Sequence, residues 1–150
     1  MTYTINVERS ADKGRLTFKH GSVAVDTTCW WDKDVKVDPG EYTSYATRMA
    51  TKTDGHDGGK REAIWLGPSV PVNNNARKAK GIFIHKGTGP SWSDGCIIIV
   101  ESELIKIWQA ITPKEQANVK VIVTDKTKST QPTVEPSPWQ YTLPFGCHYF

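Results

Sequence analysis

Hydrophobic and polar residues alternate along much of the chain, and this pattern predicts short β-strands. In residues 2–8, Tyr3, Ile5 and Val7 fall on one face of an extended chain and polar residues fall on the other. Turns that contain glycine follow this segment and the next one, which is typical of an antiparallel meander. The predicted strands cover residues 2–8, 15–19, 22–31, 40–49, 61–66 and 119–124.

The clearest helical periodicity lies near residue 105. Apolar side chains at Leu104, Ile105, Ile107, Trp108 and Ile111 form the stripe of a helix that faces a core, and Trp108 is expected to be part of that core. Residues 112–115 carry a capping signal with proline at the first helical position, which predicts a short second helical turn. The predicted fold class is mainly β, sandwich-like or barrel-like, with one long α-helix.

The length of 150 residues fits one domain with a substantial core. From residue 125 the composition shifts to Lys, Thr, Ser and Pro, which is typical of a linker or extended arm. The last twelve residues hold five aromatic side chains, so we expect this end to pack on the domain or to bind a partner. The predicted organisation is a domain at 1–125 and a Pro-rich linker with an aromatic C-terminal arm at 126–150.

A net charge of +3 is mild and its basic residues are scattered, so we expect no nucleic-acid partner. The N-terminal residues have neither a cationic start nor an apolar stretch of signal-peptide length. Three interpretations stay open from this observation: a cytoplasmic protein, export without a classical signal, or a mature chain whose signal has been removed.

The candidate chemistry lies in residues 81–100. Two apolar segments, 82–84 and 97–100, predict strands, and the polar loop between them is rich in Gly, Ser and Pro. His85 stands at one edge of this loop and Cys96 at the other. Because a thiol is mostly protonated at neutral pH, a cysteine nucleophile needs a base beside it, and adjacent strands would bring this histidine and cysteine together. The amides of Gly95 and Cys96 are candidates for an oxyanion hole.

Each residue also has a structural interpretation. A single cysteine beside Gly and Ile is often a small buried hydrophobe, and a single histidine after an apolar run is often a satisfied core or surface residue. The polar loop between them makes the catalytic interpretation the stronger one. In the loop 52–60, the side chains of Asp54, His56 and Asp57 invite a metal interpretation, but their spacing supports a solvated surface loop or a lid better. A zinc hydrolase built from this loop with His85 and Cys96 ranks third.

The order His85, Ser93, Gly95, Cys96, ending in Ser-x-Gly-Cys-Ile, resembles the catalytic motif of the L,D-transpeptidase family. The segment 37–42, with its Pro-x-Gly-x-Tyr pattern, resembles the strand entry of that family, and the outline extends over residues 3–124. The chain is closest to short L,D-transpeptidase-like proteins of phages and secreted bacterial toxins. Two positions depart from the family pattern: Asp94 replaces a second histidine, and Ile98 stands where Arg or Asn often follows.

The resemblance implies that Cys96 attacks a peptidoglycan stem peptide with His85 as its base. Ser93 or a backbone carbonyl would orient the imidazole. Candidate substrate contacts are Thr88, Trp92, Asp94 and Tyr42. The acyl-enzyme would be resolved by an amine, which gives transpeptidation or D-amino-acid exchange, or by water, which gives L,D-carboxypeptidase activity.

The missing signal-peptide pattern and the compact motif favour an antibacterial toxin or phage protein that is delivered by a non-Sec route and acts in the periplasm or cell envelope. We expect a monomer. No cofactor or metal is expected, and an immunity or carrier protein is an expected partner. The alternative is a non-catalytic module that binds the cell wall or a partner within a virion or secretion apparatus. Outside the cytoplasm, a disulfide between Cys29 and Cys147 is one interpretation, which would leave Cys96 free, and the sequence leaves this pairing open.

Overall fold

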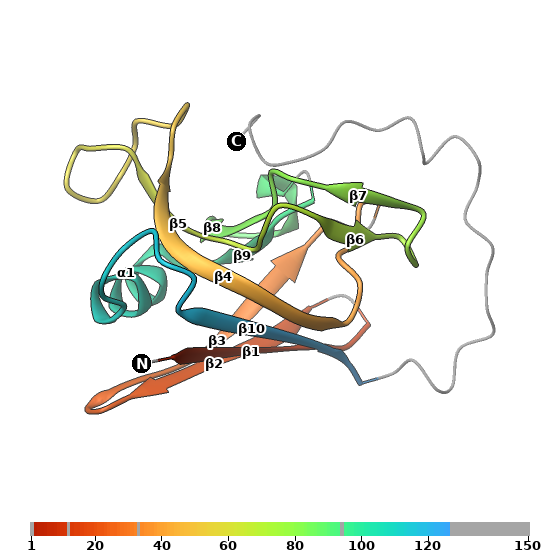
Figure 1. The fold of residues 1–150 in the computed structure, drawn as a ribbon, viewed down its shortest axis with the longest axis horizontal. Coiled ribbons are helices and arrows are strands. Elements are labelled where there is room, and N and C mark those ends of the chain that lie inside the picture. The colour runs from red at the N-terminus through yellow and green to blue at the C-terminus, as the bar shows by residue number, and fades with distance from the viewer. Residues whose placement is uncertain (1, 12, 33, 94, 127–150) are drawn as a thin grey trace.

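The computed structural model describes residues 2–11, 13–32, 34–93 and 95–126 of the chain. Eight strands form a closed barrel in the order β1-β10-β4-β5-β8-β9-β3-β2, and a separate two-stranded sheet pairs β6 with β7 (Figure 1). The mainly β class predicted from the sequence is therefore confirmed. The elements are β1 (Tyr3–Arg9), β2 (Gly14–His20), β3 (Val23–Trp31), β4 (Gly40–Met49), β5 (Arg61–Trp65), β6 (Val70–Val72), β7 (Arg77–Ala79), β8 (Phe83–Lys86), η1 (Pro90–Trp92), β9 (Ile97–Ile99), α1 (Glu101–Ala110) and β10 (Val119–Asp125).

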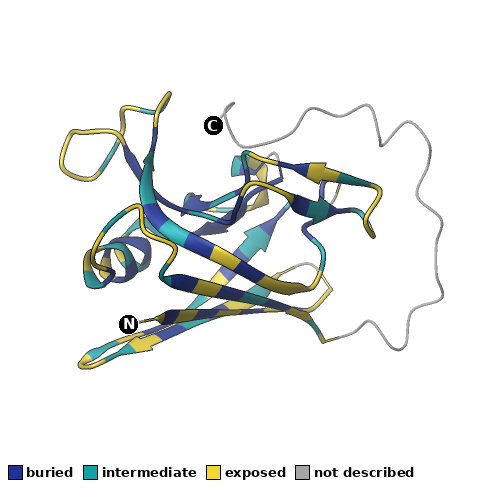
Figure 2. Ribbon diagram, viewed as in Figure 1, coloured by how far each residue is buried: buried dark blue, intermediate teal, exposed yellow. Residues whose placement is uncertain are grey.

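The N-terminal strands form the predicted meander. Strand β2 pairs antiparallel with both β1 and β3. Burial alternates strictly along β1, with Ile5 and Val7 fully buried, because successive side chains of a strand point to opposite faces. Figure 2 shows the same alternation of buried and exposed residues along β1, β10 and β4.

The barrel is mixed because two of its strand pairs are parallel. Strand β10, the last strand, lies between β1 and β4. It is parallel to β1, the first strand, and antiparallel to β4. Strand β9 lies parallel to β8, and the connection between them is the polar loop that follows His85. Parallel neighbours cannot be joined by a tight hairpin, so this loop has to cross from one end of the strand pair to the other.

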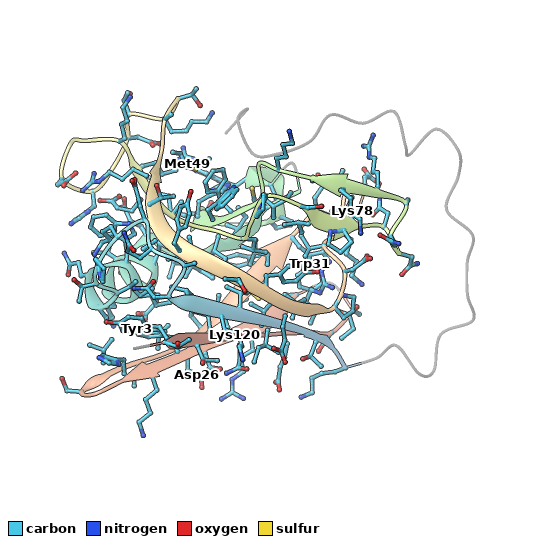
Figure 3. All side chains as sticks on the ribbon, in the orientation of Figure 1. Tyr3, Asp26, Trp31, Met49, Lys78 and Lys120 are labelled. Carbon is cyan, nitrogen blue, oxygen red and sulfur yellow. The ribbon has the colours of Figure 1, made fainter. Side chains whose placement is uncertain are left out.

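Buried apolar residues form two clusters. The main core holds the inward-facing residues of the barrel together with Leu104 and Ile107 of α1, which lies against β3, β5 and β8. The second cluster holds Met49, Ala63, Cys96 and Ile98, with Trp30, Phe83 and Trp92 half-buried against it. Figure 3 labels two buried residues, Met49 of this second cluster and Trp31. It also labels Asp26 and Lys120, which are exposed and point away from the barrel.

The helix is shorter than expected. α1 begins at Glu101 and spans ten residues, and Trp108 donates its indole N–H to the Thr47 carbonyl at 2.8 Å. The predicted second helical turn is wrong: residues 113–117 form turns and bends, and Glu115 has φ 59°, which is incompatible with a right-handed helix. Residues 67–80, for which the sequence predicts no strand, contain the β6–β7 hairpin, whose turn has three consecutive asparagines with positive φ.

The strands of the barrel run from Tyr3 to Asp125, and the division into a domain at 1–125 and an arm at 126–150 stays a prediction. The predicted arm at 126–150 lies outside the described residues, apart from residue 126. Within the part of the chain that the structure describes, no helix has the length and apolar character that a membrane span requires.

Candidate active site

His85 and Cys96 come from the two parallel strands β8 and β9. In the register of this pair, Ile84 lies opposite Ile97 and His85 opposite Ile98, and Cys96 directly precedes β9. The side chains of Ile84 and Ile97 belong to the main core, so the alternation of a strand turns His85 and Cys96 to the other face. The predicted pair therefore shares one face of neighbouring strands, two residues apart in register.

The imidazole of His85 is fully buried and oriented by one backbone group. Its Nδ1 lies 2.8 Å from the carbonyl oxygen of Lys86, which can only accept, so Nδ1 carries the proton. Nε2 is buried and makes no hydrogen bond in the structure. Burial lowers the pKa of His85 to about 4, and the nearby cations of Arg61 and Lys52 add to the effect. The result is a neutral imidazole with an available lone pair on Nε2.

The sulfur of Cys96 is also buried. Its Sγ accepts the backbone N–H of Phe83 at 3.2 Å and lies 3.7 Å from the carbonyl oxygen of Gly81. Cys96 is disulfide-bonded, whereas Cys29 is a free thiol, so the interpretation in which Cys29 forms the disulfide and Cys96 stays free is wrong. Cys147, the partner considered for Cys29 in the sequence analysis, lies outside the described residues. Cys29 is buried beside Gly14, and burial raises its pKa to about 12.

The turn before Cys96 is held by Ser93. The Ser93 hydroxyl donates to the Cys96 carbonyl at 2.5 Å and accepts the N–H of Gly95 at 3.1 Å. Ser93 therefore orders this turn, and the Lys86 carbonyl orients the imidazole. The Gly95 amide is already used, so it is not directed at an oxyanion. Gly95 has φ 110°, and a side chain there would lie 3.1 Å from Val35, which explains the glycine.

The candidate substrate contacts divide into three groups. Trp92, in η1, is half-buried beside the cluster that contains Cys96 and packs against Gly87. Thr88 is exposed at the start of the same loop, and Asp94 lies outside the described residues. Tyr42 is buried in the main core, with its hydroxyl donating to the carbonyl of Asp38. The structure therefore does not bring Tyr42 to the face of His85 and Cys96.

Sequence reasoning missed the charged residues beside His85. Arg61, the first residue of β5, is 3% exposed and forms a bidentate ion pair with Asp54 at 2.9 and 2.7 Å. Its NH1 lies 3.5 Å from His85 Nδ1, and its guanidinium carbon lies 5.7 Å from the centre of the Trp92 ring. The strand containing Arg61 was predicted, but only the pairing of β5 with β8 shows that it lies beside His85.

The loop suspected of metal binding forms a different cluster. His56, Asp57 and Glu62 place one ligand atom each within 4.8 Å of one another, and Glu62 is buried. The guanidinium of Arg48 pairs with Asp57 at 2.8 Å and approaches Glu62 at 3.7 Å, so a cation is already present between these carboxylates. Neither His85 nor Cys96 belongs to this cluster, which is inconsistent with the zinc-hydrolase arrangement.

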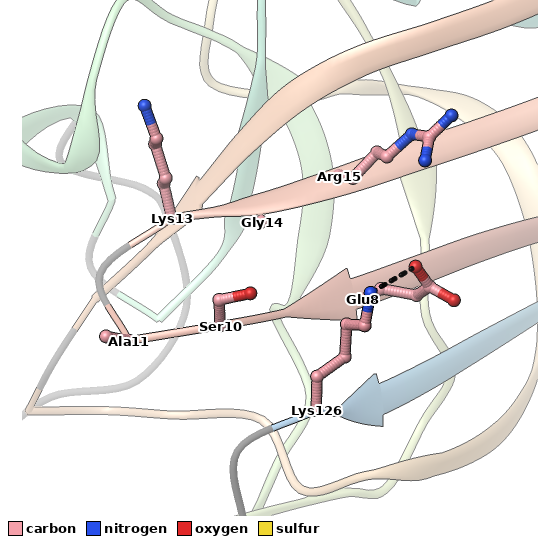
Figure 4. Close-up of a pocket in the computed structure, with 7 residues that line it drawn as sticks. All are labelled: Glu8, Ser10, Ala11, Lys13, Gly14, Arg15 and Lys126. Carbon is pink, nitrogen blue, oxygen red and sulfur yellow. Dashed lines mark ion pairs between the residues drawn. The ribbon is translucent and has the colours of Figure 1, made fainter.

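A surface pocket at the β1–β2 turn is also separate from this site. It is lined by Glu8, Ser10, Ala11, Lys13, Gly14, Arg15 and Lys126, and Figure 4 shows the ion pair between Lys126 and Glu8, at 3.8 Å. None of these residues lies on the face of β8 and β9 that carries His85.

Comparison with known proteins adds no family assignment. No protein-family model matches the chain, and no curated protein matches it significantly. The class that the structure defines is a mainly β protein built on an eight-stranded mixed barrel with one short helix.

Proposed function

We propose that the protein is a cysteine-dependent acyl transferase that acts on the stem peptide of peptidoglycan. The observation that carries this proposal is the imidazole of His85. Its Nδ1–H is fixed on the Lys86 carbonyl, its Nε2 is buried without a partner, and it shares one strand face with Cys96. A neutral imidazole held in this tautomer is suited to accept a proton from a thiol.

The nucleophile in this proposal is the thiol that a dithiol reductant releases at Cys96. Reduction breaks the disulfide, and each sulfur takes up a proton as the dithiol is oxidised. Nε2 of His85 then takes the thiol proton while Sγ attacks the carbonyl carbon of the scissile peptide. The tetrahedral intermediate collapses to a thioester, and the imidazolium returns the proton to the leaving amine. An amine or water resolves the thioester and releases the thiol.

Two backbone groups support the charges that form in this step. The N–H of Phe83 already points at Sγ, and a donor at 3.2 Å stabilises a thiolate. The Lys86 carbonyl accepts a hydrogen bond at Nδ1, the position that a carboxylate occupies in a catalytic triad, and this bond favours the imidazolium, although without the charge of a carboxylate. Trp92 is the candidate substrate contact that the geometry favours, because it borders the cluster of Cys96.

The resemblance to L,D-transpeptidases directs this chemistry to the cell wall. We propose that the protein acts in the periplasm or cell envelope as a monomer delivered by a non-Sec route. A delivered antibacterial toxin or phage protein fits this role, and an immunity or carrier protein would be its partner. Transpeptidation, L,D-carboxypeptidase activity and D-amino-acid exchange share the same thioester, so one assay can separate them.

The second candidate is a non-catalytic module that binds the wall or a partner. The specific observation in its favour is that Cys96 is disulfide-bonded and buried, so the sulfur acts there as a cross-link. In this function the strand face that carries His85 only supports the fold, and reduction of the Cys96 disulfide produces no enzymatic activity.

The deciding experiment incubates the reduced protein with tetrapeptide- and pentapeptide-bearing muropeptides and follows them by mass spectrometry. Loss of a terminal D-residue, or its exchange for an added D-amino acid, is expected for the wild type and absent for Cys96→Ala. His85→Gln is expected to lower the rate at least about 100-fold, the usual contribution of a general base. Unchanged muropeptides with reduced wild-type protein would support the binding module instead.

A further inference from the structure

Three aromatic side chains form a row across neighbouring strands, and the row ends at Cys96. Tyr45 of β4 pairs with Trp65 of β5, and Trp65 pairs with Phe83 of β8. The rings of Tyr45 and Trp65 lie 4.8 Å apart between their centres. The backbone N–H of Phe83 donates to Sγ of Cys96 at 3.2 Å. We call Tyr45, Trp65 and Phe83 the aromatic row.

The aromatic row faces away from the main core. The next residue along each of the three strands, Ala46, Ile64 or Ile84, belongs to that core, except that Ile64 precedes its aromatic neighbour. The alternation of a strand therefore turns the aromatic side chains outward, where each is half-buried. Cys96 and His85 lie on the same outward-turned face and are fully buried. This face offers an apolar surface of the kind that a docked segment covers.

The disulfide of Cys96 indicates which segment docks there. The chain holds three cysteines, of which Cys29 is a free thiol and Cys96 is disulfide-bonded. Within one chain, Cys147 is then the cysteine that remains as its partner. An extended chain from Lys126 to Cys147 could span about 70 Å, so its length is no obstacle to this pairing.

The sequence around Cys147 has the period of a strand with one apolar face. From position 139 to 149, polar or small residues and proline separate a set of aromatic, apolar and cysteine residues at every second position: Trp139, Tyr141, Leu143, Phe145, Cys147 and Tyr149. An extended chain covers about 13 Å from Leu143 to Cys147, and the strand spacings from β4 through β5 and β8 to β9 add up to about 14 Å. A segment bonded to Cys96 through Cys147 would therefore place Phe145 and Leu143 over the row.

We infer that the aromatic row is the docking surface for residues 139–149 of this chain, which a disulfide between Cys96 and Cys147 holds in place. The docked segment covers the face that carries His85 and Cys96, so the oxidised protein is inactive. A dithiol passes its two hydrogens to the two protein sulfurs and becomes a disulfide itself, and the segment then leaves the row. The effect on activity rests on the proposed function, whereas the docking does not.

The test measures how easily the disulfide of the full-length protein is reduced. The protein is equilibrated with dithiothreitol, and the thiols are trapped with a maleimide and assigned by mass spectrometry. Phe145→Ala should make the disulfide between Cys96 and Cys147 about tenfold easier to reduce, because a buried phenyl ring contributes at least this factor. The matched control is Phe150→Ala. Phe150 falls outside the alternation, so its loss should leave the equilibrium constant unchanged.

The row itself is tested in the same way. Tyr45→Ala should also make the disulfide easier to reduce, because it removes the other side of the contact. Its control is Val23→Ala, since Val23 is half-buried too but pairs with His20, at the end of β3 remote from β9. Val23→Ala should leave the equilibrium constant unchanged. Thermal unfolding of the reduced variants shows whether the barrel is intact.

An equilibrium constant that is unchanged by Phe145→Ala, or changed equally by Phe150→Ala, would overturn the docking. A disulfide-linked dimer in a non-reducing gel would overturn it as well, because the partner of Cys96 would then belong to a second copy of the chain.

Activity gives a separate readout. Cys147→Ser keeps the Cys96 thiol free, so it should process muropeptides without a reductant, whereas the wild type should need one. Processing by the oxidised wild type would contradict the block by the docked segment. If Cys147→Ser and the reduced wild type both leave muropeptides unchanged while Phe145→Ala still eases reduction, the proposed function fails and the docking stands.

Discussion

The imidazole of His85 and the carbonyl of Lys86 form a hydrogen bond between neighbouring residues of one strand, 2.8 Å long at Nδ1. This contact fixes the tautomer without any side-chain partner, so the orientation of the base is set by the backbone of β8. It also explains why no acidic residue needs to accompany His85. The buried Nε2 thereby keeps its lone pair for the proposed proton transfer from the Cys96 thiol.

The burial of His85 should make the fold sensitive to acid. The pKa of His85 is lowered from 6.5 to about 4, so the unfolded chain binds a proton between these values more readily than the folded chain does. Stability that is complete above pH 6.5 should therefore fall as the pH drops toward 4, by on the order of 3 kcal/mol. Urea unfolding at pH 7 and pH 4.5 measures this loss.

The control for this prediction is His85→Gln, whose amide can donate to the same carbonyl but does not titrate. It should remove most of the loss between these pH values. Asp54 does not interfere, because the ion pair with Arg61 lowers its pKa from 3.8 to about 2, below the window. An equal loss in the variant would assign the acid sensitivity to other groups.

The two described cysteines should differ in reactivity once the protein is reduced. Cys29 is fully buried and its pKa is about 12, so it should resist alkylation in the native state. Cys96 receives the N–H of Phe83 and shares one strand face with His85, so we expect iodoacetamide to label it first. Peptide mapping after brief labelling gives the ratio. Faster labelling of Cys29 would be incompatible with a nucleophilic Cys96.

Gly87 and Gly89 offer a matched pair of substitutions in the loop between His85 and Cys96. A Cβ at Gly87 would lie 2.6 Å from Ile98 and 2.7 Å from Trp92, whereas one at Gly89 would meet nothing within 4 Å. Gly87→Ala should displace Trp92, destabilise the protein by about 1–3 kcal/mol and reduce turnover. Gly89→Ala should change neither. Chemical denaturation and the muropeptide assay test both expectations, and equal effects at the two sites would argue against tight packing of Trp92.

Two bidentate Arg–Asp pairs should differ greatly in their contribution to stability. Arg9 is fully buried and pairs with Asp125 at 2.7 Å, and its NH1 has no hydrogen-bond partner. Asp125→Ala would leave that charge unpaired and should cost about 3 kcal/mol. The pair of Arg15 and Asp26 is exposed, so Asp26→Ala should change stability little. Thermal unfolding of both variants gives the comparison, and a similar loss in both would show that burial is not the deciding factor.

The local pattern of hydrophobic and polar residues was sufficient to predict most strands of the barrel. Alternation at Tyr3, Ile5 and Val7 predicts β1 because one face of the strand is buried, and the same reasoning predicts β2, β3, β4, β5 and β10. Strands β6 and β7 escaped prediction because each has only three residues, too short for a period of two to be visible. The turn between them depends on asparagines in a left-handed conformation, which composition shows only as a loop.

The candidate site was predictable where it is local in sequence and not where it depends on strand pairing. The loop composition between His85 and Cys96 was sufficient to select these two residues. The pairing of β5 with β8 places Arg61 beside them, and this is a tertiary relationship with no local signal. Tyr42 illustrates the reverse: its motif placed it near the site, but the register of β4 turns its ring into the core.

Closure of the barrel restricts how an extended ligand can be recognised. Each of the eight described barrel strands has a hydrogen-bonded neighbour on both sides, although some pairings are short: β3 pairs with β9 at two residues, and so does β5 with β8. Where a strand is paired on both sides, a peptide cannot add to it as a further strand, the means by which many proteins read a substrate through its main chain. We therefore expect recognition at His85 to depend mainly on side chains and on the loop residues before Cys96. Selectivity should thus follow the chemistry of substrate end groups more closely than the backbone of the peptide.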